Sequence, residues 1–498
     1  MITRLYRYVV RPISKQHCEM LDLAPYGKVN EKTVKELEGI LGSENVSTRP
    51  EDLWVYSLDS SFYRHSPDVV VRPRNVEEIS AIMKLATKEK IPVTPRGAGS
   101  GLAGSAVPNA GGILIDMTGM NKILSMDADN QITVVEAGVV CDDLNEKLGK
   151  FKLFFPPDPS SGYSATIGGM INTNAAGNRA LKYGDTKDFT QWLEAVLPSG
   201  EVIHTGSQTL KSVSGFDLTS LIAASEGSLA IVTKACLKVV PLPNAYATVM
   251  FVFDSVEPLA RATGRIRQAG IVPEMLEFMD KKTTKVATEY VGIGNLPEGN
   301  FMLVDYGGSK ESVNPAMERI VEVCKKENPK HIEQIYEHQA DYRMKLIQAR
   351  KAALPALAKL RPCLILEDCT VPLTKLPEAA VKIEEIPKVL NVEGFELGNF
   401  GHIGDGNMHP TFVFNDENPK EMSAFEKGLD MLYKDIVLPL GGSVTAEHGI
   451  GLAKAKYLPL EIEPRTLQLM REIKKTFDPY LILNPGKGKG GPYPLEAA

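Results

Sequence analysis

The stretch PRGAGSGLAG, residues 95–104, begins at the end of the short β-rich segment IPVTP and contains the pattern G-x-G-x-x-G. In a Rossmann fold, such glycines open a long helix whose N-terminus meets a pyrophosphate. Here Pro108, Gly111 and Gly112 follow closely and exclude a long helix, so the Rossmann interpretation fails. Consecutive glycines still let backbone N–H groups converge on a phosphate, with a plain glycine-rich turn as the alternative.

Two further segments favour a binding role for the glycine loop. Residues 155–186 are dense in Gly, Ala, Ser, Thr and Asn, and residues 225–233, SEGSLAIVT, are similar in character. Segments with so few large apolar side chains cannot form a core alone. They are suited to lining a groove for a long polar ligand.

The composition limits the class of protein. A chain of 498 residues with 43% hydrophobic and 24% charged residues predicts a soluble protein of two or three domains. The net charge of −6, without a basic block, argues against nucleic acid as a partner. No apolar run reaches the roughly 20 residues of a transmembrane helix. The six cysteines form no CxxC pair, which argues against a disulfide framework or an Fe–S cluster held by this chain.

The N-terminus, MITRLYRYVVRPISKQH, carries four basic residues and no acid. It resembles either a mitochondrial transit peptide or a basic arm on a cytoplasmic protein. We favour the arm, because the segment is poor in Ser and Ala. The expected location is the cytoplasm, with peripheral membrane attachment left open, or the mitochondrial matrix in a eukaryote.

The secondary-structure pattern changes near residue 245. Before it, strands are expected at 67–73, 112–117 and 131–138, helices at 30–42, 75–90 and 141–149, and a hairpin with its turn at Pro198–Gly200. After it, strands and helices alternate in an α+β pattern with antiparallel character. The expected segments are an N-terminal arm and helix (1–50), a ligand-binding domain (51–245), a cap or substrate domain (246–440) and a returning C-terminal segment (441–498).

A second glycine-rich stretch carries histidines. In FGHIGDGNMHP, residues 400–410, His402 and His409 are separated by glycines that make a helix improbable. In a straight strand an odd separation places two side chains on opposite faces, so the imidazoles converge only if the chain turns between them. Two converging imidazoles with a carboxylate form a site for Zn, Mn or Fe, and Glu447 of VTAEHGIG can supply that carboxylate.

These motifs, together with LIQARKAALPALAKL, LEDCTVP and FDPYLILNPGK, resemble a known family from about residue 50 onward. The chain resembles the FAD-linked D-2-hydroxyacid dehydrogenases, which include D-lactate dehydrogenase, D-2-hydroxyglutarate dehydrogenase and the glycolate oxidase catalytic subunit. The resemblance implies an FAD-binding domain of the vanillyl-alcohol oxidase (PCMH) type, joined to an α+β cap domain with an antiparallel sheet.

The resemblance also implies roles for individual residues. The flavin is expected to be non-covalent, because residues 95–108 hold no His or Cys. His402, His409 and Glu447 are expected to hold the divalent metal, with His448 as catalytic base. The expected FAD contacts are Pro95, Arg96, Gly97, Ala98, Gly99, Ser100, Gly101, Leu102, Pro157, Asp158, Thr166, Gly169, Asn172, Gly177, Glu226, Gly227, Ile231 and Asn484.

The expected chemistry is the oxidation of a small D-2-hydroxy acid. A metal chelated by the substrate lowers the pKa of its hydroxyl, and His448 accepts the proton. Arg350 is expected to grip the carboxylate, with a solvated helix charge as the alternative. Glu447 is assigned to the metal and its neighbour His448 to the proton, because adjacent side chains of an extended segment point apart.

The substrate and the electron acceptor are less sharply defined. Glu367 would repel a dicarboxylate if it faced the site, which favours D-lactate over D-2-hydroxyglutarate, with glycolate as an alternative. Electrons are expected to pass to an electron-transferring flavoprotein, an Fe–S subunit, a cytochrome or a quinone. Two other classes are weighed: a metal-dependent hydrolase, which leaves the FAD-type segments unexplained, and a non-catalytic flavin-binding subunit of a larger complex.

Overall fold

The structure is a computed structural model that describes residues 26–294 and 296–487. The basic N-terminal segment discussed above lies outside these residues. Contacts divide the described chain into two compact units made of non-consecutive stretches. The glycine-loop unit comprises residues 26–176, 185–242 and 447–487, and the large-sheet unit comprises residues 177–184 and 243–446. The four consecutive segments expected from the sequence stay a prediction.

The glycine loop follows a strand of a small, mostly parallel sheet. This sheet has the order β1-β2-β4-β3, with β2 (Val69–Val71), β4 (Ile113–Asp116) and β3 (Val93–Arg96) parallel to one another. Helices α2 (Glu31–Leu41) and α4 (Val76–Glu89) begin at the caps Asn30 and Asn75, as expected. No helix follows β3 directly, which agrees with the rejection of a Rossmann fold.

A second sheet of the glycine-loop unit is antiparallel. Its order is β5-β6-β10-β8-β9, with β5 at Ile123–Asp127, β6 at Ile132–Glu136 and β10 at Ile231–Lys238. The predicted hairpin is confirmed by β8 (Thr190–Val196) and β9 (Val202–Gly206). The shorter elements of this unit are η2 (Ser43–Asn45), β1 (Val46–Ser47), α3 (Pro50–Val55), α5 (Cys141–Gly149), β7 (Leu153–Phe154), α6 (Ile167–Thr173), α8 (Thr186–Phe189), α9 (Leu218–Ile222), β11 (Val240–Pro241) and α17 (Leu458–Glu461).

The C-terminal part of the chain returns to the edge of β3. After helix α18 (Pro464–Phe477), the backbone of Val93 bonds to Ile482 and Asn484, at 2.8 Å and 2.7 Å. A fully buried lysine holds this return, because Lys474 Nζ donates to Asp478 Oδ2 at 2.7 Å and to two carbonyls, those of Ser228 and Leu483. Burial lowers the pKa of Lys474, and the charge of Asp478 opposes this shift.

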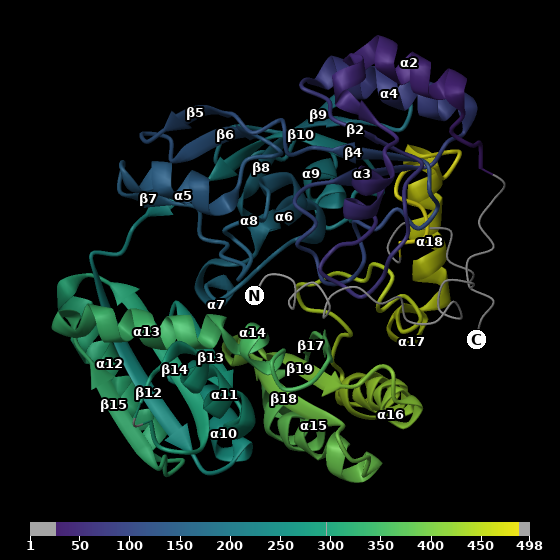
Figure 1. Cartoon of the computed structure of the whole chain (residues 1–498). Helices are drawn as coiled ribbons and strands as arrows, with labels where there is room; N and C mark the ends of the chain where they lie inside the picture. Colours follow the sequence, from purple (N-terminus) through teal and green to yellow (C-terminus); the bar gives the residue numbers. More distant parts are fainter. Residues whose placement is uncertain (1–25, 295, 488–498) are drawn as a thin grey trace. The chain divides into compact units, whose positions relative to one another are not determined.

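The large-sheet unit is built on one antiparallel sheet. The order is β15-β12-β14-β13-β18-β19-β16, with β17 paired to β19. Figure 1 labels all of these strands except β16. The strands span β12 (Ala245–Phe253), β13 (Met275–Met279), β14 (Asn300–Gly308), β15 (His331–Ile335), β16 (Cys363–Leu366), β17 (Cys369–Thr370), β18 (Glu396–Gly401) and β19 (Asn407–Phe414). The expected antiparallel α+β character is confirmed.

Helices of this unit pack against the side chains on one face of the sheet. Helices α11 (Lys281–Val291), α13 (Ala340–Lys351) and α14 (Ala353–Leu357) share a core cluster with Met275 and Met279 of β13. Since side chains alternate along a strand, Glu277 points to the same face as these methionines. The other elements of the unit are α7 (Ala180–Tyr183), α10 (Val256–Gln268), α12 (Lys310–Lys325), η3 (Glu337–Gln339), η4 (Leu373–Lys375), α15 (Leu376–Leu390), η5 (Ile403–Asp405), α16 (Pro419–Asp430), η6 (Met431–Val437) and η7 (Leu438–Leu440).

Replacing Lys474 by alanine should destabilise the glycine-loop unit by about 3–5 kcal/mol, because it leaves Asp478 buried without its cation. Both tryptophans of the chain, Trp54 and Trp192, lie in this unit, so urea unfolding followed by tryptophan fluorescence reports on it. The exposed neighbour Lys475 is the control, and Lys475→Ala should change stability by less than about 0.5 kcal/mol. Equal midpoints for the two variants would contradict the assignment.

Candidate active site

A groove in the glycine-loop unit brings the three glycine-rich segments together. It encloses about 550 Å³ of empty space, part of it open to solvent. Its lining includes eight of the residues that the resemblance assigned to FAD, namely Pro95, Gly97, Thr166, Gly169, Asn172, Glu226, Gly227 and Ile231. It also includes residues that no motif indicated, among them Ser105, Met117 and Ala137. Of these, Met117 follows β4 and Ala137 follows β6. No sequence motif marks the residue after a strand, so these two positions could not be predicted.

The other residues assigned to FAD do not line this groove. Ala98, Gly99, Ser100, Gly101, Leu102, Pro157 and Asp158 stand outside the lining set, and Gly177 belongs to the large-sheet unit. Asn484 is also outside the lining set, but its amide donates to the carbonyls of two lining residues, Ser105 and Glu226, at 3.0 Å and 2.6 Å. Its contact with a flavin stays a prediction.

The side chain of Arg96 turns back into the protein. Its Nη1 donates to the carbonyl of Leu58 at 2.6 Å, and its guanidinium carbon lies 5.6 Å from the ring centre of Tyr56. A Cβ on Gly99 would collide with this guanidinium, and Gly99 has a φ of +70°. The backbone of residues 96–99, rather than the Arg96 side chain, is therefore the candidate phosphate contact in this part of the loop.

The groove suits a long, flat cofactor. Small residues border it, so backbone atoms come close to whatever binds. A Cβ on Gly97 would collide with Thr166 Oγ1, and a Cβ on Gly227 would stand 3.0 Å from Pro95 Cγ. Backbone groups in such a lining can approach a long polar ligand without intervening Cβ atoms.

In the large-sheet unit, the structure brings His402 and His409 together. Their ring centres are 5.2 Å apart and their planes meet at 87°. The turn expected from the sequence is present: β18 ends at Gly401, η5 reverses the chain, and β19 starts after Gly406, whose φ is +86°. Both histidines are buried, with exposed fractions of 7% and 3%.

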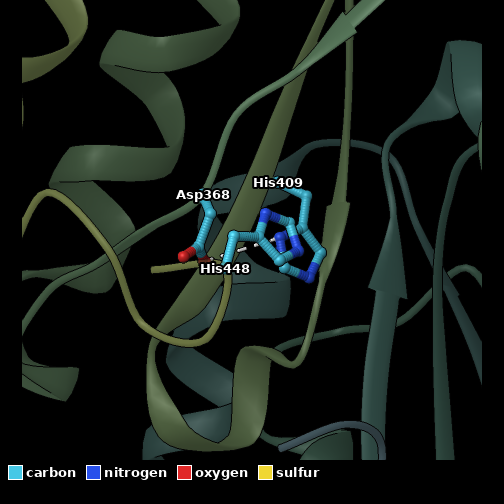
Figure 2. Close-up of side chains that lie close together, drawn as sticks. All are labelled: Asp368, His409 and His448. Atoms are coloured by element: carbon cyan, nitrogen blue, oxygen red, sulfur yellow. Dashed lines mark ion pairs between the residues drawn. The ribbon is translucent and has the colours of Figure 1, made fainter. Parts of the chain in front are cut away.

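Two overlapping groups of side chains lie close enough together to hold a metal ion. One is His402, His409 and Glu447, and the other is Asp368, His409 and His448. Figure 2 shows the second group, with an ion pair of 3.7 Å between His409 Nδ1 and Asp368 Oδ1. In each group the ligand atoms lie within 4.8 Å of one another. The first group is the set predicted from the sequence.

The bonds of Asp368 make it the weaker candidate ligand. Its Oδ1 accepts from Asn407 Nδ2 at 2.6 Å, and its Oδ2 accepts from Thr445 Oγ1 and from the backbone N–H of Ala446, both at 2.7 Å. These donors engage both oxygens. Asp368 instead anchors the chain immediately before Glu447, a role that the sequence analysis missed although LEDCTVP contains the residue.

Glu277 is a second acid that the sequence analysis missed. Its Oε1 lies 2.7 Å from His402 Nδ1, and its Oε2 lies 2.8 Å from Arg350 Nη2. Burial favours the neutral acid, but the nearby His402 and Arg350 outweigh it and lower the pKa of Glu277. The available signal was a glutamate inside the apolar strand MLEFM. With Nδ1 facing Glu277, Nε2 is the nitrogen of His402 left for a metal.

Arg350 is not a solvated helix charge. On α13 it is only 3% exposed, and its guanidinium carbon lies 4.9 Å from the ring centre of Phe400. The ion pair with Glu277 places this cation beside His402 in the large-sheet unit. Its expected grip on a substrate carboxylate stays a prediction.

Two arguments made from the sequence need correction. Residues 446–448 form bends rather than an extended segment, and His448 Nε2 lies 3.8 Å from Glu447 Oε1. The alternation of side chains along an extended strand therefore cannot be used to give Glu447 and His448 different roles. Glu367 accepts a hydrogen bond from Tyr433 at 2.5 Å, so its carboxylate is already engaged within the large-sheet unit and its charge is no argument against a dicarboxylate. Burial and the charge of Glu367 raise the pKa of Tyr433, which therefore remains a donor.

Family models match most of the described chain. The model for the C-terminal domain of FAD linked oxidases matches residues 242–488, and an FAD binding domain model matches residues 67–206. The glycolate oxidase subunit GlcD of Bacillus subtilis is 38% identical over 92% of this chain and 96% of its own length. The chain belongs to the FAD-linked oxidase family.

Other members of the family carry related names. The D-lactate dehydrogenase of Anaerostipes hadrus is 34% identical over 84% of this chain and 89% of its own length. This FAD-linked oxidase is therefore an FAD-binding oxidoreductase of the D-lactate dehydrogenase and glycolate oxidase type. None of the described helices is both long and apolar enough to cross a membrane.

Solved structures confirm the expected fold type. The p-cresol methylhydroxylase structure superposes with a TM-score of 0.79 at 18% identity, covering 92% of this chain and 96% of that one. The 4-ethylphenol oxidase of Gulosibacter chungangensis has a TM-score of 0.74 at 16% identity, covering 92% and 97%. These similarities show the PCMH-type FAD-binding fold and nothing about the substrate.

Replacing Gly227 by alanine should weaken FAD binding. Gly227 has a φ of +69°, where a side chain costs about 1–2 kcal/mol, and the new methyl would press on Pro95 inside the groove. The measurement is the flavin-to-protein ratio after dialysis. Gly149→Ala is the control, because Gly149 ends α5 with open space around it. Equal flavin content in the two variants would show that Gly227 does not border the cofactor.

Proposed function

We propose that this FAD-linked oxidase oxidises a small D-2-hydroxy acid, D-lactate to pyruvate in the first instance, with non-covalent FAD and a divalent metal. The observation that carries the proposal is a pair of buried imidazoles, His402 and His409, each with a nitrogen within 4.8 Å of a carboxylate oxygen of Glu447. A site of two histidines and one carboxylate suits Zn, Mn or Fe. The donor set of the described residues thus fits a metal of this class.

The chemistry requires two acceptors, one for a hydride and one for a proton. When bound, FAD supplies an acceptor for the hydride that leaves the substrate Cα. When bound, the metal supplies a Lewis acid that lowers the pKa of the substrate hydroxyl. The remaining task, holding the hydroxyl proton, falls to a side chain of this protein.

His448 is the residue that we assign to the proton. An imidazole is suited to accept a proton near neutral pH, and the side chain is 14% exposed. Glu447 is assigned to the metal because it completes the group with His402 and His409, not because of strand alternation. Arg350 is assigned to the substrate carboxylate. One nitrogen of its guanidinium, Nη2, already lies 2.8 Å from Glu277 Oε2.

Glycolate is the alternative substrate, because relatives named for glycolate oxidase and for D-lactate dehydrogenase are both more than 30% identical. D-2-Hydroxyglutarate also stays open, since Glu367 faces Tyr433. The proposed electron acceptor is a partner protein, such as an electron-transferring flavoprotein, an Fe–S subunit or a cytochrome, or else a quinone. We propose a cytoplasmic location, peripheral to a membrane if the acceptor is a quinone, or the mitochondrial matrix in a eukaryote.

Replacing His448 by alanine should slow flavin reduction by the 2-hydroxy acid about 10²–10⁴-fold, because the general base is lost. The variant should keep its metal and its FAD. Glu447→Gln should instead lose the metal, because an amide is a poorer ligand than a carboxylate. The measurements are metal analysis and the rate of anaerobic flavin bleaching in rapid mixing.

The control is His204→Ala. His204 lies on β9, where its ring stacks on Trp192 at 5.4 Å, so its loss should leave both the rate and the metal content unchanged. The assignment of roles is wrong if His448→Ala purifies without metal, or if it reduces its flavin at the normal rate at every pH.

A further inference from the structure

Glu226 is one of the residues that line the groove, and both oxygens of its carboxylate accept hydrogen bonds from the backbone. Its Oε1 accepts from the backbone N–H of Ile450 at 2.6 Å, and its Oε2 accepts from that of Gly451 at 2.9 Å. Hydrogen bonds of this kind, from neutral donors to a charged acceptor, are among the stronger ones in proteins. Glu226, one of the residues that the resemblance assigned to FAD, is thus joined to the loop that carries Glu447 and His448.

The loop is shaped to receive this carboxylate. Gly449 has a φ of +81°, and a Cβ there would collide with Glu226 Oε1. Gly451 has a φ of +47°, and a Cβ there would collide with the carbonyl of Ala103 in the glycine loop. That carbonyl also accepts from the N–H groups of Leu452 and Ala453, at 2.7 Å and 3.1 Å. Residues 449–453 are therefore joined to two segments of the cofactor groove.

The backbone of Glu226 is held as firmly as its side chain. Its φ of +53° is unfavourable for a residue other than glycine, so surrounding contacts must maintain it. The N–H donates to the carbonyl of Asn172 at 2.8 Å, and the carbonyl accepts from Asn484 at 2.6 Å. Asn172 and Gly227 also line the groove, and Asn172 Oδ1 accepts from Gly227 N–H at 3.1 Å.

We propose that Glu226 is a positioning residue that couples occupancy of the cofactor groove to the placement of Glu447 and His448. A cofactor packed against Gly227 and Asn172 restricts Glu226, and Glu226 restricts the loop through Ile450 and Gly451. Since coupling between two sites is reciprocal, FAD should also tighten metal binding, and metal should tighten FAD binding. This consequence for the metal rests on the proposed function, whereas the ordering of the loop does not.

The direct test is hydrogen–deuterium exchange of a peptide covering residues 447–453 in the FAD-loaded protein. In Glu226→Gln, one of the two N–H groups loses its acceptor, because an amide offers a single carbonyl oxygen. The amide left without an acceptor, that of Ile450 or of Gly451, should then exchange about tenfold faster than in the wild type, or more. The same peptide of the wild type should exchange faster after FAD is removed.

The matched control is Glu194→Gln. Glu194 is a buried glutamate of the same unit that bonds to Thr233 and Lys234 on the antiparallel sheet, at 2.8 Å and 3.1 Å, so its loss should leave the 447–453 peptide unchanged. If Glu226→Gln does not fold, the wild-type comparison with and without FAD decides alone. Equal exchange in the two FAD states, or in folded Glu226→Gln and wild type, would overturn the proposal.

A metal titration separates this inference from the proposed function. With Mn²⁺ as the probe, calorimetry should give a dissociation constant about 5–150-fold higher for FAD-loaded Glu226→Gln than for the FAD-loaded wild type. If the wild type binds no metal while the exchange result holds, the proposed metal site fails and the positioning role of Glu226 stands. If metal binds equally to both proteins, the coupling to the metal is wrong.

Discussion

A buried carboxylate is costly unless cations or hydrogen-bond donors surround it, and this constraint organises the histidines of the large-sheet unit. Glu277 is completely buried in the middle of β13, and it meets the constraint by contacting both His402 and Arg350. Asp368 meets it with Asn407, Thr445 and the N–H of Ala446. Each acid thereby fixes a different part of the candidate metal site.

The same constraint explains why a flexible sequence forms a defined site. FGHIGDGNMHP has glycines at the positions where the chain reverses, and glycine alone would leave the two imidazoles free to separate. The β18–β19 pairing and the Glu277–His402 contact hold them 5.2 Å apart at their ring centres. In the glycine-loop unit, the carboxylate of Glu226 likewise holds the loop that follows His448, by accepting from the N–H groups of Ile450 and Gly451.

The sequence predicted the parts of the structure that depend on local pattern. The caps at Asn30 and Asn75, the hairpin turn, the failure of the Rossmann pattern and the turn between His402 and His409 all follow from residues close in the chain. The partners that lie far away in sequence were not predictable in this way. Glu277 is 125 residues from His402, and Asp368 is 77 residues from Thr445, so only the folded sheet reveals those contacts. The argument that gave Glu447 and His448 different roles failed, because it assumed an extended backbone where the chain bends.

Anaerobic reduction of the flavin by D-lactate, before and after removal of metal, tests the central claim most directly. The account predicts that chelation stops flavin bleaching without releasing FAD, and that added Mn²⁺ or Zn²⁺ restores it, while L-lactate is ineffective throughout. Metal-free protein that still bleaches at the full rate with D-lactate would show that the two imidazoles and Glu447 do not form a metal site used in the reaction.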